Sequence, residues 1–350
     1  MFNALFIFGL VTTQSVVAPT SSSTSPPLSS QIKVVAGNDV VADLVRAIAG
    51  QDVELFVVGQ AGGDPHHYEP TPADAKKIES ANLVIEFGLG LDRAMGKLHR
   101  STGSKAKLLV VAEGMGKAGD ATRADDAHDV AHDDAHDDAH DDAHDDAHDH
   151  AHDHAHDQDH AHDHAHAHDH ASTAVDPHIW HDPSKVRILN ERVCAALVEV
   201  VPNSAANFRS RSLELDSQLV KLDEWIKAQV LLIPESKRLL VTTHDGLRSF
   251  GERYGFRVVG IEMTSQGADV APSQLIKMVN ALRETKSSVI FGDAAHPSRI
   301  ATTVAREANV RILETLRLDS LLQPPAATHG NAYLETMRSN VNMIVEALQK

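Results

Sequence analysis

Short apolar segments rich in β-branched residues alternate with helical patterns along two separate stretches of this chain, and this alternation limits the fold more than any other feature. The predicted strands are Lys33 to Ala36, Glu54 to Val58, Leu83 to Glu86 and Lys107 to Val111, then Arg238 to Thr242, Arg257 to Ile261, Ser288 to Phe291 and Arg311 to Leu313. The predicted helices between them are Val40 to Ile48, Pro72 to Ser80, Leu91 to Leu98, Leu247 to Tyr254, Pro272 to Glu284 and Pro297 to Ala308. Strands that alternate with helices form mostly parallel sheets. The sequence therefore predicts an α/β protein with two four-stranded lobes.

A long helical pattern separates the two stretches. Its apolar residues recur at helical spacing and are Phe208, Leu215, Leu219, Leu222, Ile226 and Val230. Between a cap at Ser204 and Pro234 the helix would have about 28 residues and a length of ~42 Å. One long helix permits only small relative movements of the lobes, whereas a hinge of extended strands would permit large closure. The predicted units are an N-terminal lobe over residues 32–203, a linking helix over 204–234 and a C-terminal lobe over 235–350 that closes with a helix from Ala332 to Leu348.

A repeat of Ala, His and Asp fills most of residues 131–170, within an insertion predicted over residues 120–172. Residues 120–170 contain sixteen of the 24 His, and His128, His132, His136, His140, His144 and His148 follow at four-residue steps. The segment has almost no apolar side chain larger than Ala, and its Asp residues repel one another. It cannot offset its ordering entropy by burial, so we expect it to be disordered in the absence of metal.

The same segment accounts for the charge of the chain. It contains eighteen Asp and one Arg, and the remaining body is neutral, with 31 charged residues of each sign. A neutral body with an acidic insertion has no basic face that could neutralise phosphates. Nucleic acids and anionic membrane surfaces are therefore excluded as expected partners.

The N-terminal residues have the pattern of an export signal. An apolar run from Ala4 to Val11 is followed by small residues at Val16 and Ala18, which predicts a signal peptide over residues 1–18 and a flexible leader over 19–31. A disordered tail is the alternative. The apolar run is shorter than the ~20 residues that span a bilayer, so the mature protein is expected to be soluble and not inserted in a membrane.

The single cysteine, Cys194, lies in the apolar pattern VCAALVEVV and is expected to be a buried core thiol. One cysteine excludes a disulfide within the chain. No cysteine stands near the predicted cleavage point, so we expect no lipid anchor.

Polar motifs follow four of the predicted strands. They are GGDPHHYEPTP after the second strand, DPHIWHDP after the fourth strand and across the insertion, TTHDGLRSF after the first strand of the second lobe and LRLDSL after its last strand. Ligands of open α/β sheets bind beyond the carboxyl ends of the strands, so the motifs would deliver their side chains to one cleft between the lobes. The candidates are His66 or His67, His178 or His181, His244, and Asp319. Three neutral imidazoles and one carboxylate form a closed set that suits tetrahedral zinc.

Other residues of the body are weaker candidates. Asp293 and Glu262 also follow strands and could replace Asp319, and Glu262 could instead orient a ligating imidazole by accepting its second N–H. The remaining histidines are His67, expected to face solvent, His181, either an auxiliary ligand or a support for one, His329, expected at the mouth of the cleft, and His99 and His296, expected on the surface at helix ends.

The motifs DPHHYEPTP, DPHIWHDP, VTTHDGLRSFGERYGF and LRLDS resemble those of the zinc and manganese solute-binding proteins of ABC transporters, the ZnuA-like group. The resemblance covers nearly the whole chain after Ile32. By position in these motifs, it implies a metal site formed by His66, His178, His244 and Asp319. It also implies an ABC permease as partner and zinc as the ion carried, by a chain that we expect to be a monomer.

Two departures from the family pattern refine this expectation. Relatives that resemble manganese binders carry a carboxylate where this chain has His244, which favours zinc here. The missing lipid-anchor cysteine points to a soluble periplasmic form rather than a lipoprotein. The repeat is not the specific site, because a solvated chain offers many near-equivalent ligand geometries. We interpret it as a low-affinity site that collects several ions, with a spacer without function as the alternative.

The leading hypothesis is therefore a periplasmic protein that captures Zn(II) for import and catalyses no reaction. A zinc hydrolase is disfavoured because catalytic zinc keeps an open position for water, and the chain has no HExxH motif. A manganese- or iron-binding homologue, or a surface metal buffer or adhesin that works through the repeat, are the alternatives.

Overall fold

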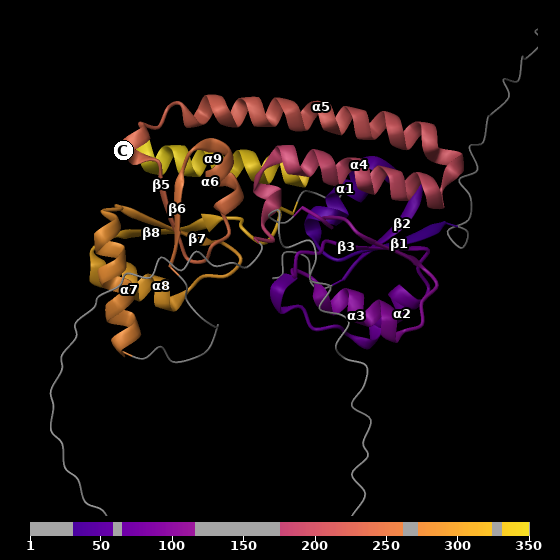
Figure 1. Cartoon of the computed structure of the whole chain (residues 1–350), viewed down its shortest axis with the longest axis horizontal. Coiled ribbons are helices and arrows are strands. Elements are labelled where there is room, and N and C mark those ends of the chain that lie inside the picture. Colours follow the sequence, from indigo (N-terminus) through magenta and orange to yellow (C-terminus); the bar gives the residue numbers. More distant parts are fainter. Residues whose placement is uncertain (1–30, 59–64, 116–175, 262–271, 324–330, 350) are drawn as a thin grey trace, which may run out of the picture.

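The computed structural model describes residues 31–58, 65–115, 176–261, 272–323 and 331–349. Two parallel four-stranded sheets form its two lobes (Figure 1). The N-terminal sheet has the order β2-β1-β3-β4 and consists of β1 (Ile32–Ala36), β2 (Val53–Val57), β3 (Leu83–Glu86) and β4 (Lys107–Val110). The C-terminal sheet has the corresponding order β6-β5-β7-β8 and consists of β5 (Leu239–Thr242), β6 (Arg257–Gly260), β7 (Val289–Asp293) and β8 (Arg311–Leu316). The second sheet thus repeats the topology of the first.

Helices cover both faces of each sheet. The helices are α1 (Asp39–Ala49), α2 (Pro72–Glu79), α3 (Arg93–Ser101), α4 (Pro183–Val200), α5 (Ala205–Val230), α6 (Arg248–Tyr254), α7 (Pro272–Thr285), α8 (Arg299–Ala308) and α9 (Ala332–Gln349). Val34 and Ala36 of β1 belong to the main core with α1, α4 and α5, whereas Val35 packs with Ile78 of α2 and Met95 of α3. This alternation is the two-residue period of a strand that is buried on both faces.

The helix α5 is the element that both lobes share. It has 26 residues and a length of about 39 Å at 1.5 Å per residue. It contacts α4 over the N-terminal lobe and α9 over the C-terminal lobe, and both lie on the same side of it in Figure 1. Buried residues at helical spacing, from Phe208 to Val230, join one hydrophobic core cluster that extends into both lobes. A shared core of this kind opposes large relative movement of the lobes.

Helix starts are encoded locally and place the functional loops. Asp182 accepts a hydrogen bond from the backbone N–H of Ser184, and Pro183 occupies the first position of α4, where its missing N–H is tolerated. Thr71 and Asp74 form a capping box at the start of α2. Both cap residues, Thr71 and Asp182, lie near the end of a motif that carries candidate ligands, so each of these motifs ends where a helix begins.

The expected fold, with two four-stranded α/β lobes joined by a long helix, is confirmed. Each predicted strand and helix is present, with ends that differ by at most four residues; the largest difference is in the linking helix, which ends at Val230 rather than near Pro234. The predicted signal peptide, the leader apart from Gln31, and the predicted insertion lie outside the described residues. Among the helices that are described, none combines the length and the apolar character needed to cross a membrane.

Candidate metal centre

The four residues expected to bind metal lie at the carboxyl ends of the strands, two from each lobe. His66 lies in a short 3-10 turn (Pro65–His67) that follows β2, and His178 immediately precedes a second such turn, η4 (Ile179–His181), which leads into α4. His244 follows β5, and Asp319 follows β8. The carboxyl ends of the strands in the two sheets thus face each other, and all four side chains lie close together.

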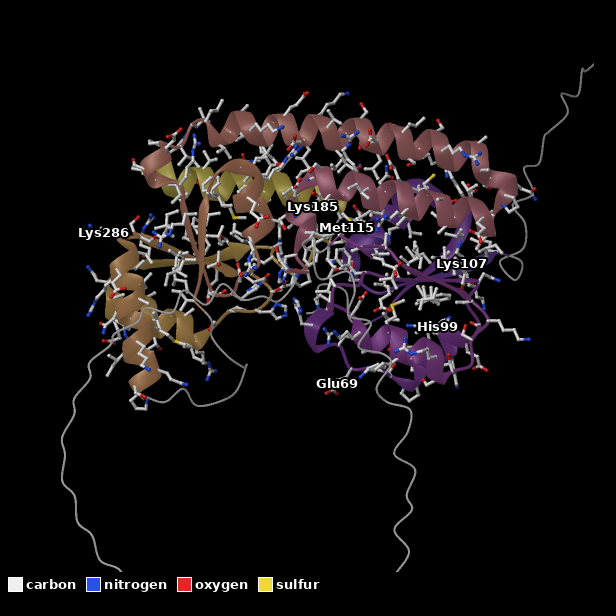
Figure 2. The ribbon with its side chains drawn as sticks, viewed as in Figure 1. Glu69, His99, Lys107, Met115, Lys185 and Lys286 are labelled. Atoms are coloured by element: carbon white, nitrogen blue, oxygen red, sulfur yellow. The ribbon has the colours of Figure 1, made fainter. Side chains whose placement is uncertain are left out.

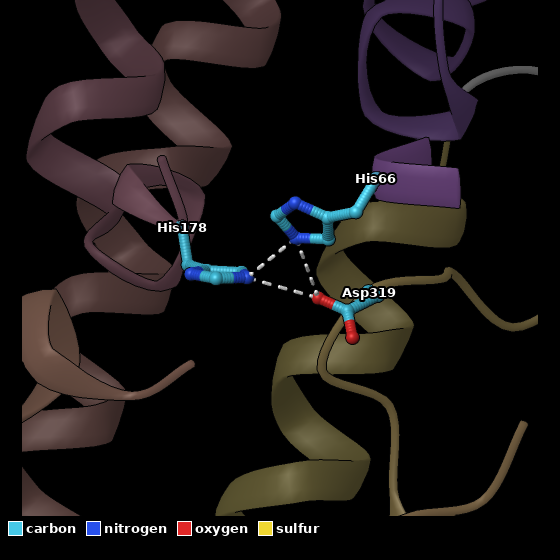
Figure 3. Close-up of side chains that lie close together, drawn as sticks. All are labelled: His66, His178 and Asp319. Atoms are coloured by element: carbon cyan, nitrogen blue, oxygen red, sulfur yellow. Dashed lines mark hydrogen bonds and ion pairs between the residues drawn. The ribbon is translucent and has the colours of Figure 1, made fainter. Parts of the chain in front are cut away.

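The donor atoms converge at short distances. The Nε2 atoms of His66 and His178 are 3.0 Å apart, and they lie 3.8 Å and 3.1 Å from Oδ1 of Asp319 (Figure 3). The Nε2 atom of His244 lies 3.2 Å from the other carboxylate oxygen, Oδ2. Three imidazole nitrogens therefore surround a single carboxylate.

Burial divides the cluster into two pairs. The side chains of His178 and Asp319, which we call the inner pair, are each 7% exposed, whereas those of His66 and His244, the outer pair, are 29% and 35% exposed. Each lobe supplies one member of each pair.

Two atoms of the cluster have no hydrogen-bond partner although they are buried. They are Nε2 of His244 and Oδ1 of Asp319, which lie within ion-pair distance of their neighbours but form no hydrogen bond with them. Buried polar atoms without a partner are costly unless another group satisfies them. A cation that accepts lone pairs from both atoms would remove this cost.

His178 is held by a carboxylate on its far side. Its Nδ1–H donates to Oδ1 of Asp176 over 3.0 Å, and its backbone N–H donates to the same oxygen over 2.9 Å. Burial lowers the pKa of His178, but Asp176 and Asp319 outweigh it and raise this pKa to about 9. Because Nδ1 faces Asp176, the Nε2 atom is the one directed at the other three side chains.

Asp319 remains a carboxylate in this setting. Burial alone would raise its pKa, but the adjacent imidazoles of His178, His244 and His66 outweigh burial and hold the pKa well below its ordinary value. A buried carboxylate oxygen beside three imidazole nitrogens is a donor set that favours the binding of a divalent cation.

The turn that carries Asp319 is fixed from two sides. Oδ2 of Asp293 accepts the backbone N–H groups of Leu318 and Asp319 over 2.7 Å and 3.1 Å. The carbonyl oxygen of Leu318 faces the opposite lobe and accepts hydrogen bonds from Nε1 of Trp180 at 3.3 Å and Nε2 of His181 at 3.0 Å. Both the amide and the carbonyl face of the turn are therefore restrained.

The loop that carries His244 depends on a glycine. A Cβ atom on Gly246 would lie 2.7 Å from Nε2 of His244, closer than real Cβ contacts, so a side chain at this position would displace the imidazole. The motif THDG thus combines a ligand candidate with the residue that leaves room for it.

Comparison with known proteins adds the family. The family model for the zinc-uptake complex component A, periplasmic (ZnuA), matches residues 34–347. The chain belongs to this family. Membership confirms the resemblance carried by the four strand-end motifs, and it makes the chain a substrate-binding protein of metal ABC transporters, a class of transport proteins rather than enzymes.

Curated relatives of this ZnuA-family chain are about equally distant. The manganese ABC transporter substrate-binding lipoprotein PsaA of Streptococcus pneumoniae is 25% identical over 322 residues, which cover 91% of this chain and 90% of the relative. The manganese-binding lipoprotein MntA of Halalkalibacterium halodurans is 25% identical over 320 residues, 91% of this chain and 89% of the relative.

Solved structures confirm the fold. The periplasmic zinc-binding protein TroA of Treponema pallidum superposes with a TM-score of 0.69 at 22% identity, over 91% of this chain and 100% of that one. A cadmium-bound periplasmic metal-binding protein of Candidatus Liberibacter asiaticus gives 0.66 at 22% identity, with the same coverage.

Other candidates of the ZnuA-family chain lie near the cluster or beyond it. His181 is 1% exposed, and its Nε2 atom is used by Leu318, so in this structure it supports the cluster rather than joining it. Asp293 lies behind the turn that carries Asp319, and its Oδ1 is 3.8 Å from Nδ1 of His296. This nitrogen atom is buried and has no hydrogen-bond partner. Asp293 and His296 thus form a second group with Asp319, whose donor atoms all lie within 4.8 Å of one another. His99, at the end of α3, binds the carbonyl of Ala106.

Three predictions cannot be compared with the structure. The side chain of His67 and the whole of Glu262 and His329 lie outside the described residues. Sequence reasoning missed the contribution of Asp176, which the DPH motif could have indicated, because a carboxylate two residues before a ligand is well placed to orient it. It also missed Ser249, whose hydroxyl donates to Oδ2 of Asp176 over 3.0 Å and for which no local signal exists.

Proposed function

We propose that this protein captures Zn(II) between its two lobes, with His66, His178, His244 and Asp319 as ligands, and delivers the ion to an ABC permease. The observation that supports this proposal most directly is the convergence of three imidazole nitrogens on one buried, ionised carboxylate. The ion would replace the proton at Nε2 of His178 and satisfy the buried donor atoms of His244 and Asp319.

The donor set favours zinc over manganese. Zinc has no geometric preference from its d electrons and accepts four tetrahedral ligands of mixed nitrogen and oxygen. Manganese favours oxygen-rich shells with more ligands. Among the described residues, Asp319 is the only oxygen donor that faces the three imidazoles directly, so the set is nitrogen-rich.

Mn(II) is the second candidate for the ion carried. It is favoured by the names of the curated relatives, several of which are described as manganese-binding or as manganese transporter components. At about 25% identity, the metal-binding residues of a relative can differ from those of this chain. We therefore base our choice of zinc on the side chains of this chain.

Capture and release are the chemistry that this set supports. Four protein ligands occupy all tetrahedral positions of zinc, which leaves none for the water molecule that a hydrolytic zinc enzyme activates. The periplasm is the compartment in which we place this step, in agreement with the description of the family model. Export by the N-terminal segment and the absence of a lipid anchor stay predictions.

Metal titration tests the proposal and the role of the repeat together. We expect one tight zinc site and several weak ones in the full chain, and only the tight site after deletion of residues 125–170, because the four proposed ligands lie outside that segment. The weak sites should disappear below about pH 6, since the imidazoles of the repeat must be neutral to bind metal.

Thermal unfolding provides a second readout. Binding across the two lobes should raise the melting temperature of the deletion variant by mass action. Loss of tight binding on deletion would instead assign the function to the repeat, as in a metal buffer. An unchanged melting temperature at saturating zinc would contradict a site between the lobes, and tighter binding of Mn(II) in competition would assign manganese.

A further inference from the structure

Each member of the inner pair is held in place by the opposite lobe. His178 belongs to the N-terminal lobe, and its partner Asp176 accepts a hydrogen bond from Ser249 of α6 in the C-terminal lobe. Asp319 belongs to the C-terminal lobe, and the preceding residue, Leu318, is bound by His181 of the N-terminal lobe. The supports of the two buried ligands therefore cross the same interface in opposite directions.

The hydroxyl of Ser249 acts as both donor and acceptor in this arrangement. It donates to Oδ2 of Asp176 over 3.0 Å and accepts a hydrogen bond from Nζ of Lys185 over 3.1 Å. Lys185 extends from α4 near the junction of the lobes (Figure 2). Ser249 is 2% exposed, so water cannot readily replace either bond. Because the other oxygen of Asp176 holds the His178 imidazole, the position of Ser249 is transmitted to the ligand.

The imidazole of His181 has an equivalent function on the other side. It is 1% exposed, and its Nε2–H donates to the carbonyl of Leu318 over 3.0 Å. Trp180 donates to the same carbonyl over a longer distance, 3.3 Å. The backbone of Leu318 continues directly into Asp319, so a shift of this carbonyl moves the carboxylate.

We propose that His181 and Ser249 are positioning residues that couple the ligand geometry to the placement of the lobes, so that a small separation of the lobes releases the ion. This inference rests on the function proposed above. A hydrogen bond weakens steeply once its donor and acceptor are more than about 3.5 Å apart, so a displacement of under one ångström at this interface loosens both buried ligands at once. The shared core around α5 opposes large opening, and with crossed supports large opening is not needed.

The rate of zinc dissociation tests the coupling. Full-length protein loaded with Zn(II) is mixed with excess chelator, and the slowest phase of release is followed, because the weak sites of the repeat empty first. The variants are His181→Phe, which keeps a ring and removes the donor, Ser249→Ala, and the double variant. His181→Gln retains an N–H at the reach of Nε2. His99→Phe is the matched control, since His99 also binds a backbone carbonyl, Ala106, but within one lobe.

We expect His181→Phe and Ser249→Ala each to release zinc roughly three- to tenfold faster, the effect of one net hydrogen bond, with unchanged stoichiometry. His181→Gln should restore slow release, and His99→Phe should release zinc at the wild-type rate even if its melting temperature falls. The increase in release rate of the double variant should be smaller than the product of the two single increases, because the first substitution already displaces the lobes.

Wild-type release rates in both single variants would overturn the coupling. A rate increase in the double variant equal to the product of the two single increases would also overturn it, because it would indicate two independent local effects. Ser249→Ala removes one atom and keeps the test open if His181→Phe does not fold. The proposed function fails on a different result, namely tight zinc binding that survives Asp319→Asn.

Discussion

In both lobes the last strand of the sheet leads to a ligand candidate that is buried, whereas the second candidate of each lobe is about one third exposed. His178 follows β4 and Asp319 follows β8, the equivalent strands of two sheets with the same order. The outer pair does not follow equivalent strands, since His66 comes after the edge strand β2 and His244 after the central strand β5. The lobes are therefore alike in how they place the inner pair and different in how they place the outer pair.

This difference indicates a division of tasks. The inner pair lies in a low-dielectric interior, where charge and hydrogen bonds have large effects, and it is supported by Asp176, Asp293 and groups of the other lobe. The outer pair has solvent access, so an ion can exchange its water ligands there first. Substitution effects should then follow burial rather than lobe, and four experiments would sharpen or break this comparison.

The largest effect is expected for Asp319→Asn. The substitution removes the buried negative charge and leaves three imidazoles around a neutral amide, at a cost of about 4 kcal/mol in zinc binding, or roughly a thousandfold. His66→Ala should cost less, because water can take the place of an exposed ligand. Zinc titration against a competing chelator measures both, with Glu69→Gln as an exposed carboxyl control. Equal losses for Asp319→Asn and His66→Ala would remove the distinction between the pairs.

The second effect concerns pH. Burial, and then the charge of His178, lowers the pKa of His181 to about 4, below its ordinary value of 6.5. On acidification the imidazole of His181 is therefore protonated at a higher pH in the unfolded chain than in the folded chain. The stability that neutral His181 contributes is present above about pH 6.5, and it is lost as pH falls through 4.

The expected loss is up to about 3 kcal/mol. Urea unfolding of metal-free wild type and His181→Gln between pH 7 and pH 4 measures it as the difference between the two curves. A difference that does not change with pH would show that His181 is accessible to water in the folded protein.

A smaller effect is expected for Asp176→Asn. The amide oxygen can still accept the hydrogen bond from Nδ1–H of His178, but it no longer places a negative charge behind the imidazole. Zinc affinity should therefore fall about 10- to 100-fold, as is usual for the carboxylate behind a metal-binding imidazole. Ser184→Ala is a useful control, because its hydroxyl binds a different carboxylate, Asp182, at a helix start. Calorimetry of zinc binding provides the measurement, and a loss below threefold would contradict the role of Asp176.

The smallest effect is expected for His244→Glu, in the outer pair. The substitution produces two nitrogen and two carboxylate donors, which lowers zinc affinity and narrows the ratio of zinc to manganese affinity, by on the order of tenfold or about 1.4 kcal/mol. Competition titrations with both ions, on protein without residues 125–170, would measure this ratio. An unaltered ratio would exclude His244 from the ligands.

The fold was readily predictable because its signals are local. The apolar periods of β1, β3 and α5 lie within single segments, and each cap, such as Asp182 at α4, acts over a few residues. The candidate ligands were predictable for a related reason, since a parallel sheet delivers every strand end to one edge. Residue type and position after a strand narrowed the candidates to His66 or His67, His178 or His181, His244 and Asp319, and the family resemblance selected among them.

The arrangement around these residues depended on contacts far apart in sequence. Whether Asp293 or Asp319 faces the imidazoles was open, because both follow strands of the same lobe; the structure directs Asp293 to the backbone of the turn and Asp319 to the cluster. Ser249 lies 73 residues from Asp176 and His181 lies 137 residues from Leu318, so no local pattern could connect them.

The sequence by itself thus determined the two lobes, the linking helix, the family and the chemical types of the donors, since these follow from short-range periodicity and motif composition. The tertiary structure alone decided which donors are buried, which polar groups orient them and which lobe supplies each support. The physical reason is that burial and hydrogen-bond partners are properties of the interface between the sheets, which exists only once both lobes are folded and packed against α5.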